Sequence, residues 1–160
     1  MAELRSEYRA RLLKSMHETL AFFDASAATL SRAYAPGKWT LQQVLVHLSD
    51  TQTVLLERLR RLASSENPSL LAFDPDAWAD KLFYGSRELN VAKLQFEAAT
   101  RSILELARTL PESTDARTGT HSQSGTRSFA QILEMSATHT EHHLEQARAI
   151  VAGQTWTPRK

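Results

Sequence analysis

Cysteine is absent from this chain of 160 residues. Its absence excludes disulfides, a thiolate nucleophile supplied by the protein and every zinc site that uses cysteine. An excess of charge of one sign is also missing, because 19 Lys+Arg stand against 18 Asp+Glu. Binding to nucleic acid needs a concentration of basic side chains against the phosphates, so we expect no nucleic-acid partner.

Long apolar runs are missing as well. No window approaches the 18 apolar residues of a membrane span, and the first residues lack the apolar core of a signal peptide. We therefore expect no membrane partner and a cytoplasmic protein. One domain, residues 1–160, is expected at this length. Such a chain can bury a core without a disulfide or a metal, so a bound metal would serve function.

β-branched residues are scarce, with eight Val and Ile together against 22 Leu and 22 Ala. Strands favour β-branched residues, whereas Leu and Ala favour helices, so an all-α fold is expected. Four long segments space their apolar residues by three and four, the period of an amphipathic helix. With their caps they are about residues 2–31, 40–63, 86–110 and 128–151.

Capping signals mark where several helices begin. Thr40 with Gln43 and Ser128 with Gln131 each have the spacing of a capping box. Residues 64–85 form a long connection, in which Asp74 precedes Pro75 and predicts a short extra helix. This connection is long enough to cross one end of a four-helix bundle, which allows an up-up-down-down order as well as a meander. Residues 111–127 are predicted to be a polar loop.

Histidines are the main candidates for metal ligands or catalytic residues. There are six: His17, His47, His121, His139, His142 and His143. On a helix of about 100° per residue, His143 lies about 40° and His139 about 80° from Phe129, on the predicted inner face. His142 lies about 140° away, among polar residues.

His139 and His143 are one helical turn apart, so their rings can share one metal ion. A hydrogen-bonded pair of core histidines is the alternative, because buried imidazoles need either partners or a metal. His47 is the candidate third ligand. It lies about 120° from the apolar stripe of its helix, so periodicity leaves it undecided between a neighbouring helix and solvent.

Three motifs carry a resemblance to a known family. They are Trp39-Thr-Leu-Gln-Gln-Val-Leu-Val-His47-Leu-Ser-Asp50, Phe73-Asp-Pro-Asp-Ala-Trp78 and His139-x-x-His142-His143-Leu-x-Gln146. Their order and spacing resemble the DinB superfamily, most closely its YfiT-like branch of metal-dependent hydrolases and bacillithiol transferases. The resemblance implies an up-up-down-down four-helix bundle, a homodimer, and a divalent metal on His47, His139 and His143.

Other residues have weaker claims. Asp50, Glu141 and Gln146 are candidates for orienting the imidazoles, although a solvated helix surface is the simpler interpretation of each. The motif around Glu141 is not HExxH, so it gives no metalloprotease base. His121 would lie in the polar loop and His17 on a helix surface. Trp39 and Trp78 are expected to pack at helix ends, Tyr84 to line an entrance, and Trp156 to cover a partner surface.

Three functions remain open at this point. The first is a metal-dependent enzyme whose ion, zinc or nickel, activates water or a low-molecular-weight thiol toward a small-molecule substrate. Its catalytic residues, beyond the metal ligands, are not identified by the sequence. The second is a non-catalytic metal-binding module of a stress response. The third is a helical dimer whose histidines are structural.

Overall fold

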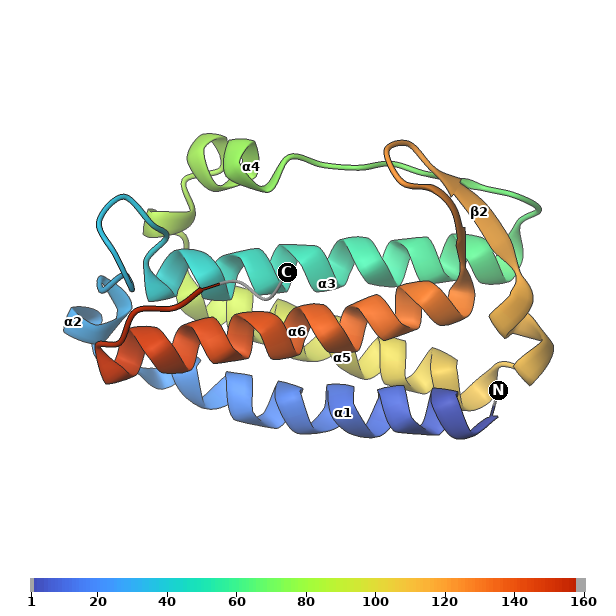
Figure 1. Cartoon of the computed structure of the whole chain (residues 1–160), viewed down its shortest axis with the longest axis horizontal. Coiled ribbons are helices and arrows are strands. Elements are labelled where there is room, and N and C mark those ends of the chain that lie inside the picture. Colours follow the sequence, from blue (N-terminus) through green and yellow to red (C-terminus); the bar gives the residue numbers. More distant parts are fainter. Residues whose placement is uncertain (1, 158–160) are drawn as a thin grey trace.

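The computed structural model of the chain describes residues 2–157, in which four long helices lie side by side (Figure 1). They are α1 (Ala2–Leu20), α3 (Leu41–Ser64), α5 (Leu89–Thr109) and α6 (Phe129–Ala152). Residue 1 and residues 158–160 of the expected single domain lie outside the described part.

Short elements connect the long helices. The helical ones are η1 (Ala21–Asp24), α2 (Ala27–Leu30), α4 (Pro75–Lys81), η2 (Tyr84–Ser86) and η3 (Glu112–Ala116). The strands are β1 (Ser69–Leu70), β2 (Thr118–His121) and β3 (Gly125–Ser128). The long connection between α3 and α5 does contain a short helix, α4, and Asp74 caps it by accepting from the backbone N–H groups of Asp76 and Ala77.

Side-chain contacts give the direction of each helix. Arg11 pairs with Glu141 and Glu18 with Arg148, so α1 and α6 run parallel. Gln42 donates to the carbonyl of Arg87, and Gln95 donates to Asp50, so α3 and α5 also run parallel.

The two parallel pairs run in opposite directions. Arg5 contacts the carbonyl of Ala107 near the end of α5, whereas Asp24, beyond the end of α1, contacts Lys93 near the start of α5. The order is therefore up-down-down-up, and the expected up-up-down-down order is wrong. The reason is that, within the described residues, the connection that runs the length of the bundle joins α3 to α5, whereas an up-up-down-down bundle needs such connections after its first and third helices.

The two predicted capping boxes are present. Thr40 Oγ1 accepts from the backbone N–H of Gln43, and Gln43 Oε1 accepts from the backbone N–H of Thr40. Ser128 and Gln131 make the same reciprocal pair at the start of α6. Each box satisfies two backbone donors that the first turn leaves without an intrahelical acceptor.

The first predicted helix is interrupted. Its apolar period continues to Leu30, yet the chain leaves the helix after Asp24 and starts again at Ala27. Ser26 lies in extended conformation and its hydroxyl accepts from the backbone N–H of Thr29, so it caps the new turn. Periodicity does not reveal this break, because the apolar residues on both sides of it stay on one face.

The predicted polar loop 111–127 contains structure that the sequence did not indicate. After η3 it forms the hairpin of β2 and β3, and β1 of the long connection pairs in parallel with β2. Gly119 permits this close packing, because a Cβ there would lie 2.6 Å from the carbonyl oxygen of Pro68. The sheet thereby fastens the crossing segment to the hairpin.

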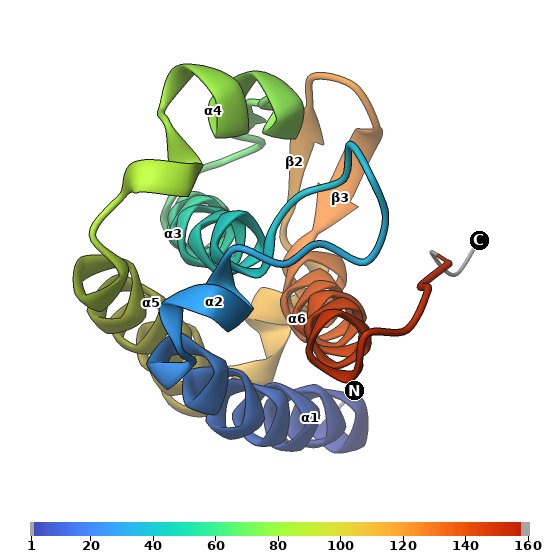
Figure 2. The ribbon, with the colours of Figure 1, turned by 90° about the vertical axis from the view of Figure 1, so that its left-hand side faces the viewer.

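Several connecting segments lie on one side of the bundle. Seen along the helices, α4, the hairpin and the loop before α3 lie on the side where α3 and α6 are neighbours (Figure 2). The opposite side is closed by α1 and α5. No helix within residues 2–157 has the length and hydropathy to cross a lipid bilayer.

Candidate metal centre

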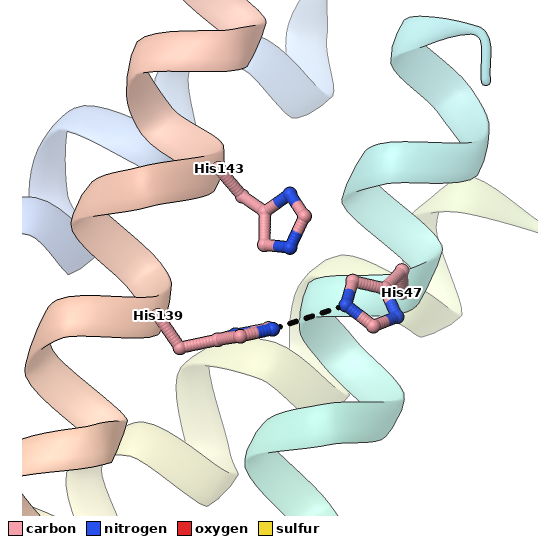
Figure 3. A group of neighbouring side chains, drawn as sticks. All are labelled: His47, His139 and His143. Carbon is pink, nitrogen blue, oxygen red and sulfur yellow. Dashed lines mark hydrogen bonds between the residues drawn. The ribbon is translucent and has the colours of Figure 1, made fainter. Parts of the chain in front are cut away.

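The three histidines of the predicted ligand set come together between α3 and α6. His47 lies in the second turn of α3, while His139 and His143 project from consecutive turns of α6 (Figure 3). One ring nitrogen from each lies within 4.8 Å of the others. His47 is buried, whereas His139 and His143 are partly exposed.

The spacing of the nitrogens fits a shared ion. His47 Nε2 lies 3.1 Å from His139 Nε2. Two imidazole nitrogens at the 2.0–2.1 Å typical of a zinc ligand and at a tetrahedral angle are about 3.3 Å apart. The observed separation is therefore close to that of two ligands on one metal, although the pair is equally within hydrogen-bonding distance.

Burial keeps the three rings neutral. It lowers the pKa of His47 to about 3 and that of His143 to about 4, and each positive charge would also face other histidines. Burial, with His143 and His47 nearby, lowers the pKa of His139 well below its usual value. At neutral pH the cluster therefore presents uncharged imidazoles, which is the form that binds a metal.

A hydrogen bond fixes the orientation of one ring. His143 Nδ1 lies 2.7 Å from Gln146 Oε1, which can only accept, so Nδ1 carries the proton and Nε2 presents its lone pair. Of the candidate orienting residues, Gln146 is thus the one placed to act. His139 Nδ1 is buried with no hydrogen-bond partner, and Thr51 Oγ1 lies 3.4 Å from both nitrogens of His47.

Aromatic rings surround the cluster. Trp39 lies 5.0 Å and Phe73 6.5 Å from His47, measured between ring centroids. His142 packs edge-on against His143, and Trp156 packs against His142. Trp39 and Trp156 therefore lie beside the site, where the sequence indicated only helix-end packing and a partner surface.

Phe73, which neighbours His47, also lines a cavity of about 590 Å³ along α3. The crossing segment supplies most of its apolar lining, with Leu71, Ala72, Phe73 and Trp78, whereas α3 contributes Val54 and the polar side chains of Thr53, Glu57 and Arg61. The sequence singled out Trp78 and the turn around it but gave no signal for a cavity.

The remaining candidates lie elsewhere. Asp50 accepts from Arg87 and Gln95, toward α5, and Glu141 pairs with Arg11 of α1, so neither orients a ligand. Tyr84 is fully buried and does not line an entrance. His17 is exposed on α1, as expected.

Fold and cluster together define the class: helical bundles with three convergent histidines of the kind that hold a divalent metal. The family model of the DinB superfamily matches residues 8–147, and the chain belongs to that superfamily.

Individual relatives agree with this assignment. A protein of Oceanobacillus iheyensis named "Putative metal-dependent hydrolase" is 28% identical over 146 residues, covering 91% of this chain and 81% of its own. A protein of the same name from Bacillus mycoides is 22% identical, covering 85% of this chain and 78% of its own.

A solved structure has the same fold. It is that of YfiT from Bacillus subtilis, described as "a probable metal-dependent hydrolase with an unusual four-helix bundle topology". It superposes with a TM-score of 0.85 at 18% identity, over 92% of this chain and 86% of that chain.

Proposed function

We propose that the protein is a metal-dependent hydrolase whose divalent ion is held by His47, His139 and His143. The observation that carries the proposal is the convergence of three neutral imidazoles with no fourth ligand: among the described residues, no carboxylate joins the group. Three protein ligands with an open position are typical of catalytic sites, whereas structural zinc sites have four.

A zinc or nickel ion held there would lower the pKa of a bound water toward neutrality, or hold a low-molecular-weight thiol as the thiolate. The thiol would have to come from outside, because the chain has no cysteine. We take hydrolysis as the leading reaction because relatives carry that name, and thiol transfer as the second.

Side chains around the cluster orient the histidines and shape their surroundings. Gln146 holds the His143 ring by its Nδ1–H, and Trp39 and Phe73 cover His47. Apolar rings beside the ligands exclude water and strengthen electrostatic interactions inside the site. The partial exposure of His139 and His143 leaves the cluster accessible to a small-molecule substrate.

The first test is the metal content of the purified protein without a histidine tag. We expect about one divalent ion per chain in the wild type by mass spectrometry. His143→Ala should lose most of it, and His17→Ala, which changes an exposed histidine of α1, should keep it. A full metal load in His143→Ala would refute the ligand assignment.

The second test is turnover. Ester, amide and thiol-conjugation substrates should be assayed before chelation, after chelation and after return of the metal. Metal-dependent release of acid and alcohol or amine supports hydrolysis, and metal-dependent consumption of an added thiol supports transfer. A protein that holds its metal but turns over none of them would instead be a non-catalytic metal-binding module.

A further inference from the structure

Arg58, on α3, is a buried cation with few hydrogen-bond partners. The residue is only 5% exposed, and burial lowers the pKa of its guanidinium. Nη2 donates to the carbonyl oxygen of Leu71 at 2.6 Å, while the buried Nε has no partner. A guanidinium has five N–H donors and keeps its charge in proteins. One carbonyl therefore leaves most of its hydrogen-bonding capacity unused.

Arg58 forms no ion pair with a carboxylate in the described part of the chain. Glu57 is adjacent in sequence and raises the pKa of Arg58, but its carboxylate pairs with the exposed Arg61. The other charged or titratable side chains whose effects reach this region are His121 and Arg127, of which Arg127 is a second cation. Burying a cation without a counter-ion is costly, so the cluster lacks an anion.

His121 offers a further donor here. Its Nδ1 accepts from the backbone N–H groups of Gln123 and Ser124, at 3.2 and 3.3 Å, so in the neutral ring Nε2 carries the proton. His121 pairs with Leu70 in the sheet, and Arg58 bonds the carbonyl of the next residue, Leu71. The backbone of His121 and the side chain of Arg58 thus contact neighbouring residues of the crossing segment, and both Arg58 and Arg127 lower the pKa of His121.

Arg127 faces the same side of the sheet. It is the cross-strand partner of Gly119, and cross-strand partners and alternate residues of a strand share a face, so Gly119, His121 and Arg127 lie together. That face is turned toward α3, because a Cβ on Gly119 would lie 3.1 Å from Leu62. Arg127 Nε donates to Ser124 Oγ, and its side chain also lines a surface pocket that includes Gln131 and Glu134 at the start of α6.

We infer that Arg58, His121 and Arg127 bind the anionic group, a carboxylate or a phosphate, of a small-molecule ligand. The cluster presents hydrogen-bond donors and positive charge, with no acidic side chain among its members. Charge-assisted hydrogen bonds to guanidinium groups are the strong, geometrically specific ones that carboxylates and phosphates form. A metal cation or a neutral apolar group would leave these donors unsatisfied.

The position of the cluster relates it to the three histidines. Arg58 follows His47 by eleven residues, so it lies about 20° away around α3 and about 16 Å along it. Both therefore lie on one face of α3, which the crossing segment and the hairpin cover over its second half (Figure 1). The anion would be the far end of an elongated substrate whose reacting group lies at the histidines, a step that rests on the proposed function.

Inorganic phosphate is the probe, titrated by calorimetry at constant ionic strength into metal-free and metal-loaded protein. We expect both forms to bind it, since the cluster does not include the metal ligands. Arg58→Met and Arg127→Gln should weaken binding by about tenfold or more, the loss expected for a charge-assisted contact. Arg60→Gln, which removes an exposed cation of the same helix, should leave the dissociation constant unchanged.

Thermal unfolding of the variants separates a binding role from a structural one. If Arg58 is an anion-binding residue, Arg58→Met should not lower the melting temperature measured without phosphate. Phosphate should raise the melting temperature of the wild type but not that of Arg58→Met. Arg127 is only partly buried, so Arg127→Gln tests the site even if Arg58→Met does not fold.

Three results would overturn the inference: no phosphate binding by the metal-free wild type, unchanged binding in Arg58→Met, or unchanged binding in Arg127→Gln. His143→Ala serves as the converse control. If it loses its metal and keeps phosphate binding, the anion site stands independently of the metal site. If the wild type holds no metal yet binds phosphate through Arg58, the proposed function fails and the anion site remains.

Discussion

His143 Nδ1 donates a hydrogen bond to Gln146 Oε1, three residues on along α6, and so aims its Nε2 at His47 and His139. Replacing Gln146 by Leu should weaken metal binding by about 10- to 100-fold, the usual effect of removing a hydrogen bond behind a histidine ligand. Competition with a chromogenic chelator measures the affinity.

Gln146→Glu is the matched control, because a carboxylate at the same position also accepts from Nδ1. It should retain metal affinity within a few-fold of the wild type. If the Leu and Glu variants bind metal equally well, Gln146 is only a packing residue and does not position the ring.

The low pKa values of the cluster predict how the metal-free protein responds to acid. Unfolded histidines have a pKa near 6.5, whereas the folded values are about 3 for His47 and about 4 for His143. Between pH 6.5 and 4 the unfolded state therefore binds more protons, so the free energy of unfolding should fall as the pH is lowered through this range. Above about pH 7 these groups should contribute no pH dependence.

Urea unfolding in the presence of a chelator, from pH 7.5 to 4.5, measures this slope. His47→Gln has one such group fewer and should show a shallower decline over the same interval. Equal slopes for the wild type and the variant would mean that His47 does not titrate with a depressed pKa.

The ion pair of Arg5 and Asp115 is buried, with side chains 7% and 2% exposed. Asp115→Leu should destabilise the protein by about 3–5 kcal/mol, because it leaves the guanidinium buried without its counter-ion. Arg5→Met combined with Asp115→Leu should recover much of this loss, since no buried charge remains. Chemical denaturation of both variants gives the comparison.

Recovery in the double variant will be incomplete for a definite reason. Arg5 also donates to the carbonyl oxygens of Ala107 and Leu110, so its removal leaves acceptors at the end of α5 unsatisfied. If the double variant is less stable than Asp115→Leu, these carbonyl contacts outweigh the cost of burying the unpaired guanidinium.

Gly119 is the position where the sheet tolerates no side chain. An added Cβ would lie 2.6 Å from the carbonyl oxygen of Pro68, which accepts the backbone N–H of Thr120. Gly119→Ala should therefore cost about 1–3 kcal/mol, as overpacking does. Gly85→Ala, where nothing lies within 4 Å, is the control and should change stability by less than about 0.5 kcal/mol.

Hydrogen exchange would locate the effect of Gly119→Ala. We expect faster exchange at the amides of Thr120 and Ser122, which bond to Pro68 and Leu70 of the crossing segment. Unchanged protection there would show that the crossing segment moves with the hairpin and accommodates the methyl group.

Much of the helical framework was predictable because its signals are local. The capping residues Thr40, Asp74 and Ser128 each begin a helix where expected, since a side chain accepting from a backbone N–H within three residues needs no tertiary partner. The break at Ser26 was missed because the apolar residues around it keep their period.

Helix direction and the small sheet depend on long-range contacts and could not be predicted in this way. Both an up-up-down-down and an up-down-down-up order bury the same apolar faces, and only contacts such as Gln95 to Asp50 distinguish them. β2 has no alternation of apolar and polar residues that would predict a strand. Its residue facing α3 is Gly119, which fits there because it has no side chain.

The candidate site was predictable in part for the same reason. The angular positions of His139 and His143 follow from one helix alone, whereas His47 depends on how α3 faces α6, and the family resemblance was needed to include it. The proposed anion-binding residues Arg58, His121 and Arg127 come from separate segments that the sheet brings together, so no pattern within one segment predicts them.

His47 and His139 are 92 residues apart, and His139 and His143 both belong to α6, the last helix within the described residues. During translation, therefore, the nascent polypeptide has one ligand and no way to assemble the triad until α6 has left the ribosome. The histidine cluster is consequently completed only after α6 has been synthesised, and a product lacking α6 would retain only His47 of the three.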